Sequence, residues 1–162
     1  MMDIQLTLNG VAREITCMPG ETLFTVLRRE GCFSVRYGSG TGETGSAAVL
    51  VDGRLVAADV LLAAQADGHE VTTVEQLNVA TGELHPIQAA FKEEHGLQCG
   101  FCTPGMMLVG SALIAENPDP TDDDVRWAIS GQICRCTGYM NIVKAIQAAA
   151  KAKASASAPA NA

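Results

Sequence analysis

The sequence predicts an α+β protein, in which a small mixed β-sheet is followed by a group of helices. Short runs of alternating apolar and polar residues, separated by glycine-containing turns, fill the first 77 residues and are typical of strands. From about residue 78, apolar residues recur every three or four positions, which is typical of helices that bury one face. We therefore expect two domains, residues 1–77 and residues 78–150, with residues 151–162 as a disordered tail.

The first domain is expected to begin with a hairpin. Apolar residues alternate with polar ones from Ile4 to Leu8, and Asn9-Gly10 follows, a pair that favours the tight turn of a two-residue hairpin. Further along the chain we expect a return strand over residues 11–17, one helix over residues 22–29, and strands over residues 48–51, 55–57 and 70–74. Two hairpins and one helix on a mixed sheet are the pattern of a small β-grasp domain.

Four helices are expected in the second domain. They span residues 85–94, residues 104–116, a segment that begins after Thr121, and residues 139–150. Thr121 is a good N-cap, and the three aspartates that follow it suit the positive end of the helix dipole. That third helix is expected to carry Val125, Trp127, Ile129 and Ile133. The tail has no large apolar side chain to bury, so we expect it to be disordered.

Composition and charge exclude several kinds of partner. The net charge is −7 and the pI is about 4.8. The 11 basic residues are scattered along the chain, so nucleic acid is not expected as a partner. No secretory signal and no apolar run long enough to enter a membrane is found. We expect a cytoplasmic protein, in which six cysteines need an explanation other than disulfides.

Four of the six cysteines form two close pairs. Cys99 and Cys102 are separated by two residues, and Cys134 and Cys136 by one. Both pairs lie at expected helix ends, so two helical hairpins can bring the four thiolates together. Such a donor set suits zinc or an iron–sulfur cluster. Zinc sites usually repeat the C-x2-C spacing, which favours the cluster, but the spacing alone leaves zinc open.

Longer motifs around these pairs resemble those of a known family. The motifs are Gln98-Cys-Gly-Phe-Cys-Thr-Pro-Gly105 and Gly131-Gln-Ile-Cys-Arg-Cys-Thr-Gly-Tyr139. They resemble the helical-domain signature of the iron–sulfur subunits of molybdenum hydroxylases, the superfamily of xanthine dehydrogenase, aldehyde oxidoreductase and carbon monoxide dehydrogenase. The resemblance covers about residues 3–150 and includes the stretches Val49-Leu-Val-Asp-Gly53, Gln65-Ala-Asp-Gly68 and Thr72-Thr-Val-Glu75.

The resemblance implies an electron-transfer subunit of an oxidoreductase complex. The first domain would be a [2Fe–2S] ferredoxin-like β-grasp domain, and the four-helix domain would hold a [2Fe–2S] cluster on Cys99, Cys102, Cys134 and Cys136. Substrate chemistry would take place at a molybdopterin cofactor in a separate large subunit, so this chain would have no catalytic residue of its own. Cys136 would contact the pterin as well as iron, and Gln98 would lie near the pterin. In relatives, electrons then continue through a second cluster to FAD in a flavin subunit.

The first domain departs from the family pattern at four positions. Members normally hold a second cluster there, with C-x4-C-x2-C spacing and a fourth cysteine further on. Alignment on the glycine-rich loop and the Val-Leu-Val-Asp-Gly stretch places those positions at Ser39, Thr44, Ala47 and Asp59. Hydroxyl and carboxylate oxygens match a thiolate site poorly, and alanine offers no ligand. We therefore expect one cluster in all, and an acceptor that is either close to it or a different carrier such as a cytochrome.

Three further features are expected to carry no chemistry. Cys17 is expected to be a small core residue, and Cys32 a partly buried thiol. Gly40-Thr-Gly42-Glu-Thr-Gly45 matches the dinucleotide fingerprint, but that motif needs a following helix. A strand is expected instead, so nucleotide binding is rejected. The three histidines are isolated and are expected on the surface or at helix ends.

Two other functions are weighed against electron transfer within a molybdenum enzyme. One is a non-redox scaffold, zinc-bound or metal-free, that only holds the large subunit. The two intact cysteine pairs weigh against it, because drift would be expected to erode them. The other is an electron carrier for an unrelated partner. Gln98 and Cys136, which fit a pterin-facing surface, weigh against that function.

Overall fold

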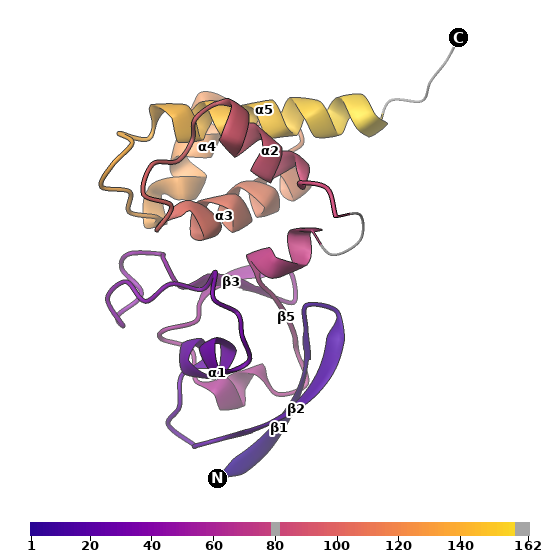
Figure 1. Ribbon diagram of the computed structural model, residues 1–162, viewed down its shortest axis with the longest axis vertical. Helices are drawn as coiled ribbons and strands as arrows, with labels where there is room; N and C mark the ends of the chain where they lie inside the picture. Colours follow the sequence, from indigo (N-terminus) through magenta and orange to yellow (C-terminus); the bar gives the residue numbers. More distant parts are fainter. Residues whose placement is uncertain (79–81, 158–162) are drawn as a thin grey trace.

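The computed structural model describes residues 1–78 and 82–157, and within them one five-stranded sheet lies beside a group of helices (Figure 1). The strands are β1 (Met2–Leu8), β2 (Val11–Cys17), β3 (Ala48–Val51), β4 (Arg54–Ala57) and β5 (Glu70–Thr72). The helices are α1 (Leu23–Arg29), α2 (Pro86–Glu93), α3 (Thr103–Glu116), α4 (Asp122–Ala128) and α5 (Met140–Ser157). Short 3-10 helices are η1 (Ala63–Ala66), η2 (Val74–Asn78) and η3 (Ile129–Gly131). The predicted α+β class is confirmed.

The first hairpin is confirmed as predicted. β1 and β2 pair antiparallel, with Met2 opposite Cys17 and Leu8 opposite Val11. Asn9 and Gly10 both have positive φ, 50° and 77°, as a type I′ turn requires. The alternation in β1 places its apolar side chains on the face that the core covers.

The sheet combines antiparallel and parallel pairs in the order β2-β1-β5-β3-β4. β5 pairs in parallel with β1, with Thr7 opposite Glu70, and antiparallel with β3, with Leu50 opposite Thr72. The late strand thus joins the two hairpins into one sheet. β5 ends at Thr72, before the predicted residue 74, because the chain turns into η2.

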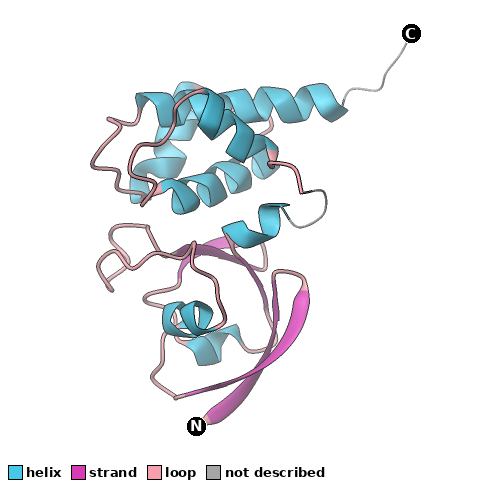
Figure 2. Ribbon diagram, in the orientation of Figure 1, coloured by secondary structure: helices cyan, strands magenta, loops and turns pink. Residues whose placement is uncertain are grey.

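Buried apolar side chains gather in two clusters, one on the sheet and one among the helices. The sheet cluster includes Leu23, Val26 and Leu27 of α1. The helical cluster is built from α2, α3, α4 and α5, and it also contains Cys102 and Cys134. The two groups of elements occupy opposite ends of the molecule, and α3 packs against β3 and β4 where they meet (Figure 2).

The prediction that Ile133 belongs to the third helix is wrong. α4 starts after the N-cap Thr121, as expected, but it ends at Ala128 and is followed by one 3-10 turn. Ile133 lies beyond that turn and is exposed. Its backbone N–H donates to the carbonyl of Thr44 at 3.0 Å, so a contact with the sheet half replaces the next helical hydrogen bond. Trp127 lies on α4 as predicted, but it is 82% exposed.

The last helix is longer than predicted. α5 continues to Ser157, whereas disorder was expected from residue 151 onward. That expectation is wrong for residues 151–157, because alanine and lysine favour helix even without a face to bury. Residues 158–162 lie outside the described residues.

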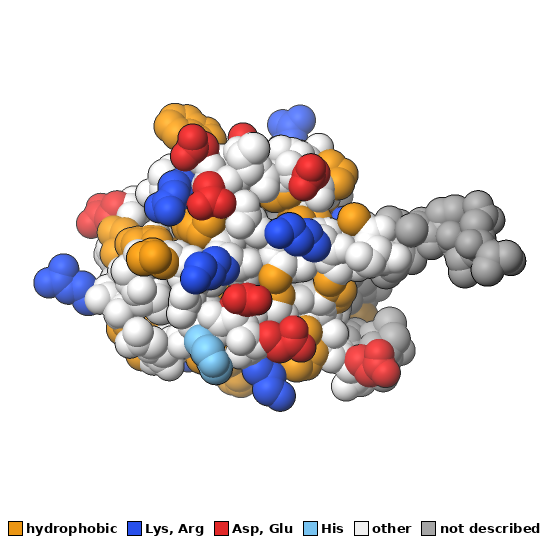
Figure 3. All heavy atoms as spheres, turned by 90° about the horizontal axis from the view of Figure 1, so that it is seen from above, with side chains coloured by type: hydrophobic (Ala, Val, Ile, Leu, Met, Phe, Trp, Pro, Cys, Tyr) orange, Lys and Arg blue, Asp and Glu red, His pale blue; other side chains and the backbone are white. Residues whose placement is uncertain are grey.

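Charges of both signs are mixed on the helical end of the molecule. Figure 3, which views the molecule from that end, shows acidic and basic side chains side by side rather than one continuous basic area. On this face the structure therefore offers no run of cations for a phosphate backbone. None of the helices among the described residues is long and apolar enough to cross a membrane.

Candidate metal centre

The first cysteine pair sits at the start of α3. Cys102 occupies the N-cap position, and its carbonyl accepts the first helical hydrogen bond from Met106 at 3.0 Å. Gly100 has a φ of +80°, a backbone conformation that glycine adopts without strain. The turn at Gly100 therefore lets Cys99 and Cys102 reach the same cavity from adjacent turns of chain.

The second pair lies in the loop between η3 and α5. The backbone N–H of Cys134 donates to the Tyr139 hydroxyl at 2.9 Å, and Thr137 Oγ1 lies 3.1 Å from Cys134 Sγ. Thr137 Oγ1 also accepts from the N–H of Tyr139 at 3.2 Å. These bonds shape the Cys134–Tyr139 loop, so that the side chains of Cys134 and Cys136 point toward the start of α3.

The sulfur atoms meet across the two motifs. Cys136 Sγ lies 3.5 Å from Cys99 Sγ, and both of these side chains are exposed. Cys102 and Cys134, which are buried, form a second pair that lies close enough for each thiol to shift the pKa of the other. The four sulfurs thus form one exposed pair and one buried pair. Each pair contains one cysteine from the first motif and one from the second.

The buried pair has unequal acidities. Burial, followed by the hydrogen bond with Cys134, raises the pKa of the Cys102 thiol to about 12. Burial also acts to raise the pKa of Cys134, but hydrogen bonds from Thr137 and from backbone N–H groups lower it overall. Without a metal, the site therefore favours a proton on Cys102. Iron or zinc would displace that proton, because only the thiolate is a ligand.

The exposed pair also has unequal acidities. The backbone N–H of Phe101 and the thiol of Cys136 lower the pKa of Cys99. The hydrogen bond to Cys99 in turn raises the pKa of Cys136. Each pair therefore combines one thiol whose pKa is lowered with one whose pKa is raised.

A cavity of about 330 Å³ connects the cysteines to the sheet half of the molecule. Its walls include all four cysteines, and on the opposite side Gly38, Thr44 and Ser46, with Phe101, Ile133 and Arg135 completing the lining. Within the described residues, no three His, Cys, Asp or Glu side chains converge as a single metal ion requires. Two separate thiol pairs suit two irons better than one zinc, because a [2Fe–2S] cluster takes two ligands on each iron whereas zinc needs four donors around one point. Thiolate donors in a partly buried cavity thus fit the cluster.

Gln132 lies beside this cavity, between the loop before β3 and the start of α3. The sequence analysis did not identify this residue. Its side chain is buried, and an added Cβ at Gly45 would lie 2.4 Å from its Nε2. An added Cβ at Gly105 would lie 2.7 Å from its Oε1. That oxygen has no hydrogen-bond partner among the described residues. The only signal in the sequence is the position of Gln132 two residues before Cys134.

The four positions without cysteine lie in or next to the loop that faces the cavity. Ala47 is buried, and Asp59 is buried with one oxygen, Oδ2, accepting from the N–H of Gly42 at 3.4 Å. Ser39 Oγ accepts from the N–H of Thr41 at 3.3 Å. The loop is thus held by its own hydrogen bonds.

The structure also locates the other residues that the sequence singled out. Gln98 is exposed directly before Cys99. Cys17 and Cys32 are both buried in the sheet cluster, Cys32 more deeply than predicted. A strand, β3, follows the Gly40–Gly45 loop, so the requirement of the dinucleotide fingerprint for a helix there is not met.

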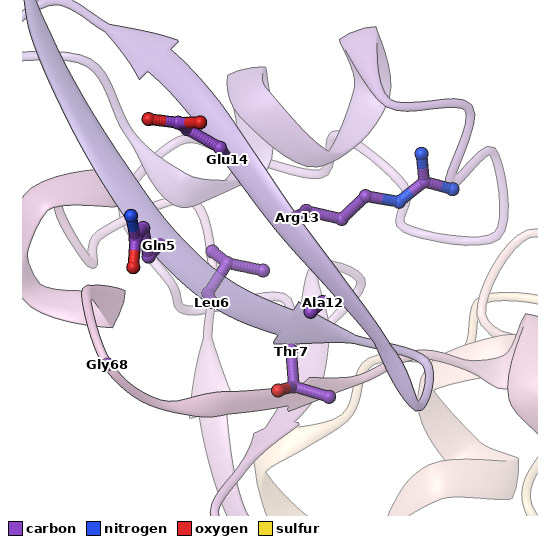
Figure 4. A pocket seen from close by; sticks show the side chains of 7 residues that line it. All are labelled: Gln5, Leu6, Thr7, Ala12, Arg13, Glu14 and Gly68. Atoms are coloured by element: carbon purple, nitrogen blue, oxygen red, sulfur yellow. The ribbon is translucent and has the colours of Figure 1, made fainter.

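Another hollow of the surface is not part of the candidate centre. It measures about 430 Å³ and lies along the β1–β2 hairpin, with Gln5, Thr7, Arg13 and Glu14 around it (Figure 4). Figure 4 shows these side chains pointing away from one another rather than toward a common point. It shares no residue with the cysteine cavity, so the thiol site is the better candidate.

Comparison with known families defines the class of protein. Residues 73–147 match the family model of a [2Fe-2S] binding domain. This range contains all four cysteines of the cavity and most of the helical half. The chain is therefore an iron–sulfur protein.

Comparison with individual proteins gives the family. The chain is 42% identical over 141 residues to a probable xanthine dehydrogenase subunit of Bacillus subtilis, with 86% of this chain and 80% of that protein covered. It is 42% identical over 145 residues to the nicotinate dehydrogenase small FeS subunit of Eubacterium barkeri, with coverages of 89% and 92%. A chain of quinoline 2-oxidoreductase from Pseudomonas putida 86 superposes with a TM-score of 0.91 at 39% identity, covering 97% of this chain and 98% of that one. The chain belongs to the family of iron–sulfur subunits of xanthine dehydrogenases and related molybdenum hydroxylases.

Proposed function

We propose that this chain carries electrons away from a molybdopterin site in a large partner subunit, through one [2Fe–2S] cluster on Cys99, Cys102, Cys134 and Cys136. The observation that supports this most directly is the meeting of both cysteine pairs around one cavity. When bound, the cluster would take up and release one electron at a time. The catalytic chemistry would remain in the large subunit.

Each iron would be held by two cysteines, one from each motif. Cys99 and Cys136 would hold the iron at the exposed end, because their sulfurs lie 3.5 Å apart. Cys102 and Cys134 would hold the iron at the buried end. The four cysteines would thus hold a one-electron carrier between the exposed end of the cavity and the side that the sheet half closes.

The exposed end of the site is the proposed contact with the large subunit. Gln98 and Cys136 are exposed there, and Phe101, Ile133 and Met140 present large apolar side chains, between 45% and 64% exposed, around the same loops. Burial of such side chains would stabilise an interface and exclude water from the cluster. Cys136 and Gln98 are the residues that we propose to contact the pterin.

The two hydrophobic clusters support the predicted division of the chain. Residues 1–77 would be a ferredoxin-like β-grasp domain, and residues 78–150 the helical cluster-binding domain. We propose that the first domain holds no cluster, because Ser39, Thr44, Ala47 and Asp59 supply no thiolate. Electrons would then leave directly from the single cluster to a flavin subunit or a cytochrome. A cytoplasmic location stays a prediction.

Metal content and electron paramagnetic resonance (EPR) of the purified complex test this function. We expect two irons and two acid-labile sulfides per chain, with one S = 1/2 signal after reduction with dithionite. Four irons and two signals would refute the proposed loss of the first cluster. Zinc, or no metal, would refute electron transfer and support the scaffold.

A further inference from the structure

Two hydroxyl groups of the sheet half, those of Thr44 and Ser46, line the cysteine cavity, and neither donates its proton to a described atom. Ser46 is only 4% exposed, and no hydrogen bond of its Oγ is found within the described residues. Thr44 Oγ1 accepts a long bond of 3.4 Å from the N–H of Ser46, but its own proton is donated to no described atom. Thr44 is only half-buried, and Ser46 Oγ is not among the fully buried side-chain atoms that lack a partner. Both hydroxyls are therefore available to donate a hydrogen bond to a group bound in the cavity that they line.

The backbone holds these hydroxyls toward the cysteines. The Thr44 carbonyl accepts from Ile133, one residue before Cys134, at 3.0 Å. An added Cβ at Gly38 would lie 1.9 Å from Thr44 Oγ1 and 3.1 Å from Ser46 Oγ. The absence of a side chain at Gly38 therefore leaves room for both oxygens at one point of the cavity wall.

We propose that the hydroxyls of Thr44 and Ser46 donate hydrogen bonds to the sulfur atoms of the cluster and raise its reduction potential. Reduction adds one negative charge to the cluster, and donors stabilise the more negative state more strongly. Thr44 stands at one of the four positions where the family pattern has a cysteine. The position that no longer holds a second cluster would thus tune the remaining one. This inference rests on the proposed function.

An EPR-monitored redox titration of the complete complex tests the inference. Thr44→Val keeps the shape of the side chain and removes the hydroxyl, and Ser46→Ala removes the other hydroxyl. Each is expected to lower the midpoint potential by about 59 mV, which is a tenfold change in the equilibrium constant of a one-electron couple. Thr44→Ser should retain the wild-type potential. Thr41→Val is the matched control, because the Thr41 hydroxyl is exposed in the same loop and bonds to Ser39 and Glu43.

A second readout separates hydrogen bonding from a general change of the loop. Pulsed EPR in D2O should detect exchangeable protons coupled to the reduced wild-type cluster, and fewer of them in Thr44→Val and Ser46→Ala. Unchanged potentials and couplings in a complex with a normal signal would overturn the inference but leave the proposed function intact. An equal shift of the potential in the Thr41→Val control would show that the loop has only a structural role, and it would also overturn the inference. Loss of the cluster in both Thr44→Val and Ser46→Ala would have the same meaning. A wild-type complex without iron would overturn the proposed function first.

Discussion

At the scale of single residues, Cys136 is one of the two exposed cysteines of the candidate site. Its sulfur lies 3.5 Å from that of Cys99, at the open end of the cavity. We predict that Cys136→Ala removes the S = 1/2 signal and lowers the retained iron by more than about tenfold, since even loss of a group that only supports a ligand costs about 10- to 100-fold in metal affinity. Iron analysis and EPR of the complex measure this.

Cys17→Ala is the matched control for that prediction. Cys17 is buried in the sheet cluster and lies outside the cavity, so its replacement should leave the iron content and the EPR signal unchanged. The free energy of unfolding should fall by about 1 kcal/mol, as for an ordinary core substitution. Wild-type turnover of Cys136→Ala with an artificial acceptor would contradict the role of Cys136.

The residue types of the site could be predicted from the sequence, but their pairing could not. The cysteines of each pair are at most three positions apart in the sequence, and this spacing alone identifies them as candidate ligands. Which sulfur meets which depends on how α3 and the Cys134–Tyr139 loop approach in space, and that is a long-range property. Gln132 was missed for the same reason, because its contacts with Gly45 and Gly105 come from distant parts of the chain.

At the scale of elements, Gly45 decides how closely the loop before β3 approaches the helical half. It has a φ of +67°, and an added Cβ would lie 2.4 Å from both the Gly131 carbonyl oxygen and Gln132 Nε2. We predict that Gly45→Ala lowers the free energy of unfolding by about 3–5 kcal/mol, the range of severe single substitutions. Urea unfolding of the full chain measures the change.

Gly53→Ala separates backbone strain from the clash. Gly53 also has a positive φ, +77°, but an added Cβ there would meet no atom within 4 Å. Its replacement should therefore cost only the strain of the left-handed conformation, about 1–2 kcal/mol. If the two variants were equally destabilised, the close approach of the loop to Gln132 would not contribute to stability.

Elements defined by neighbouring residues could be predicted, whereas those defined by distant contacts could not. The β1–β2 hairpin follows from local alternation and Asn9-Gly10, and its turn and return strand match the prediction, although β1 begins at Met2 rather than Ile4. The order of the sheet depends on β5, which pairs with β1 more than 60 residues away, and no local pattern predicts that. Ile133 was misplaced because its apolar spacing continues the helical period, while its N–H bonds to Thr44 instead.

At the scale of the whole molecule, the proposed metal site belongs to one of the two hydrophobic clusters. Cys102 and Cys134 are part of the helical cluster, whereas the sheet cluster contains no cysteine of the cavity. Because metal binding to buried thiolates is also folding free energy, iron should stabilise the helical half directly. Iron should affect the stability of the sheet half only through the loop that contacts Gln132 and Ile133.

We predict that chelation of iron raises hydrogen exchange in one half of the molecule. Amides of residues 97–106 and 131–143 should exchange at least about tenfold faster, which corresponds to about 1.4 kcal/mol, while those of β1 and β2 should be unchanged. Hydrogen-exchange mass spectrometry of the complex before and after chelation makes the comparison. Equal loosening of both halves would mean that the packing of α3 on β3 and β4 couples them into one cooperative unit. In that case iron would stabilise the chain as a whole, and the two clusters would not be separate units of stability.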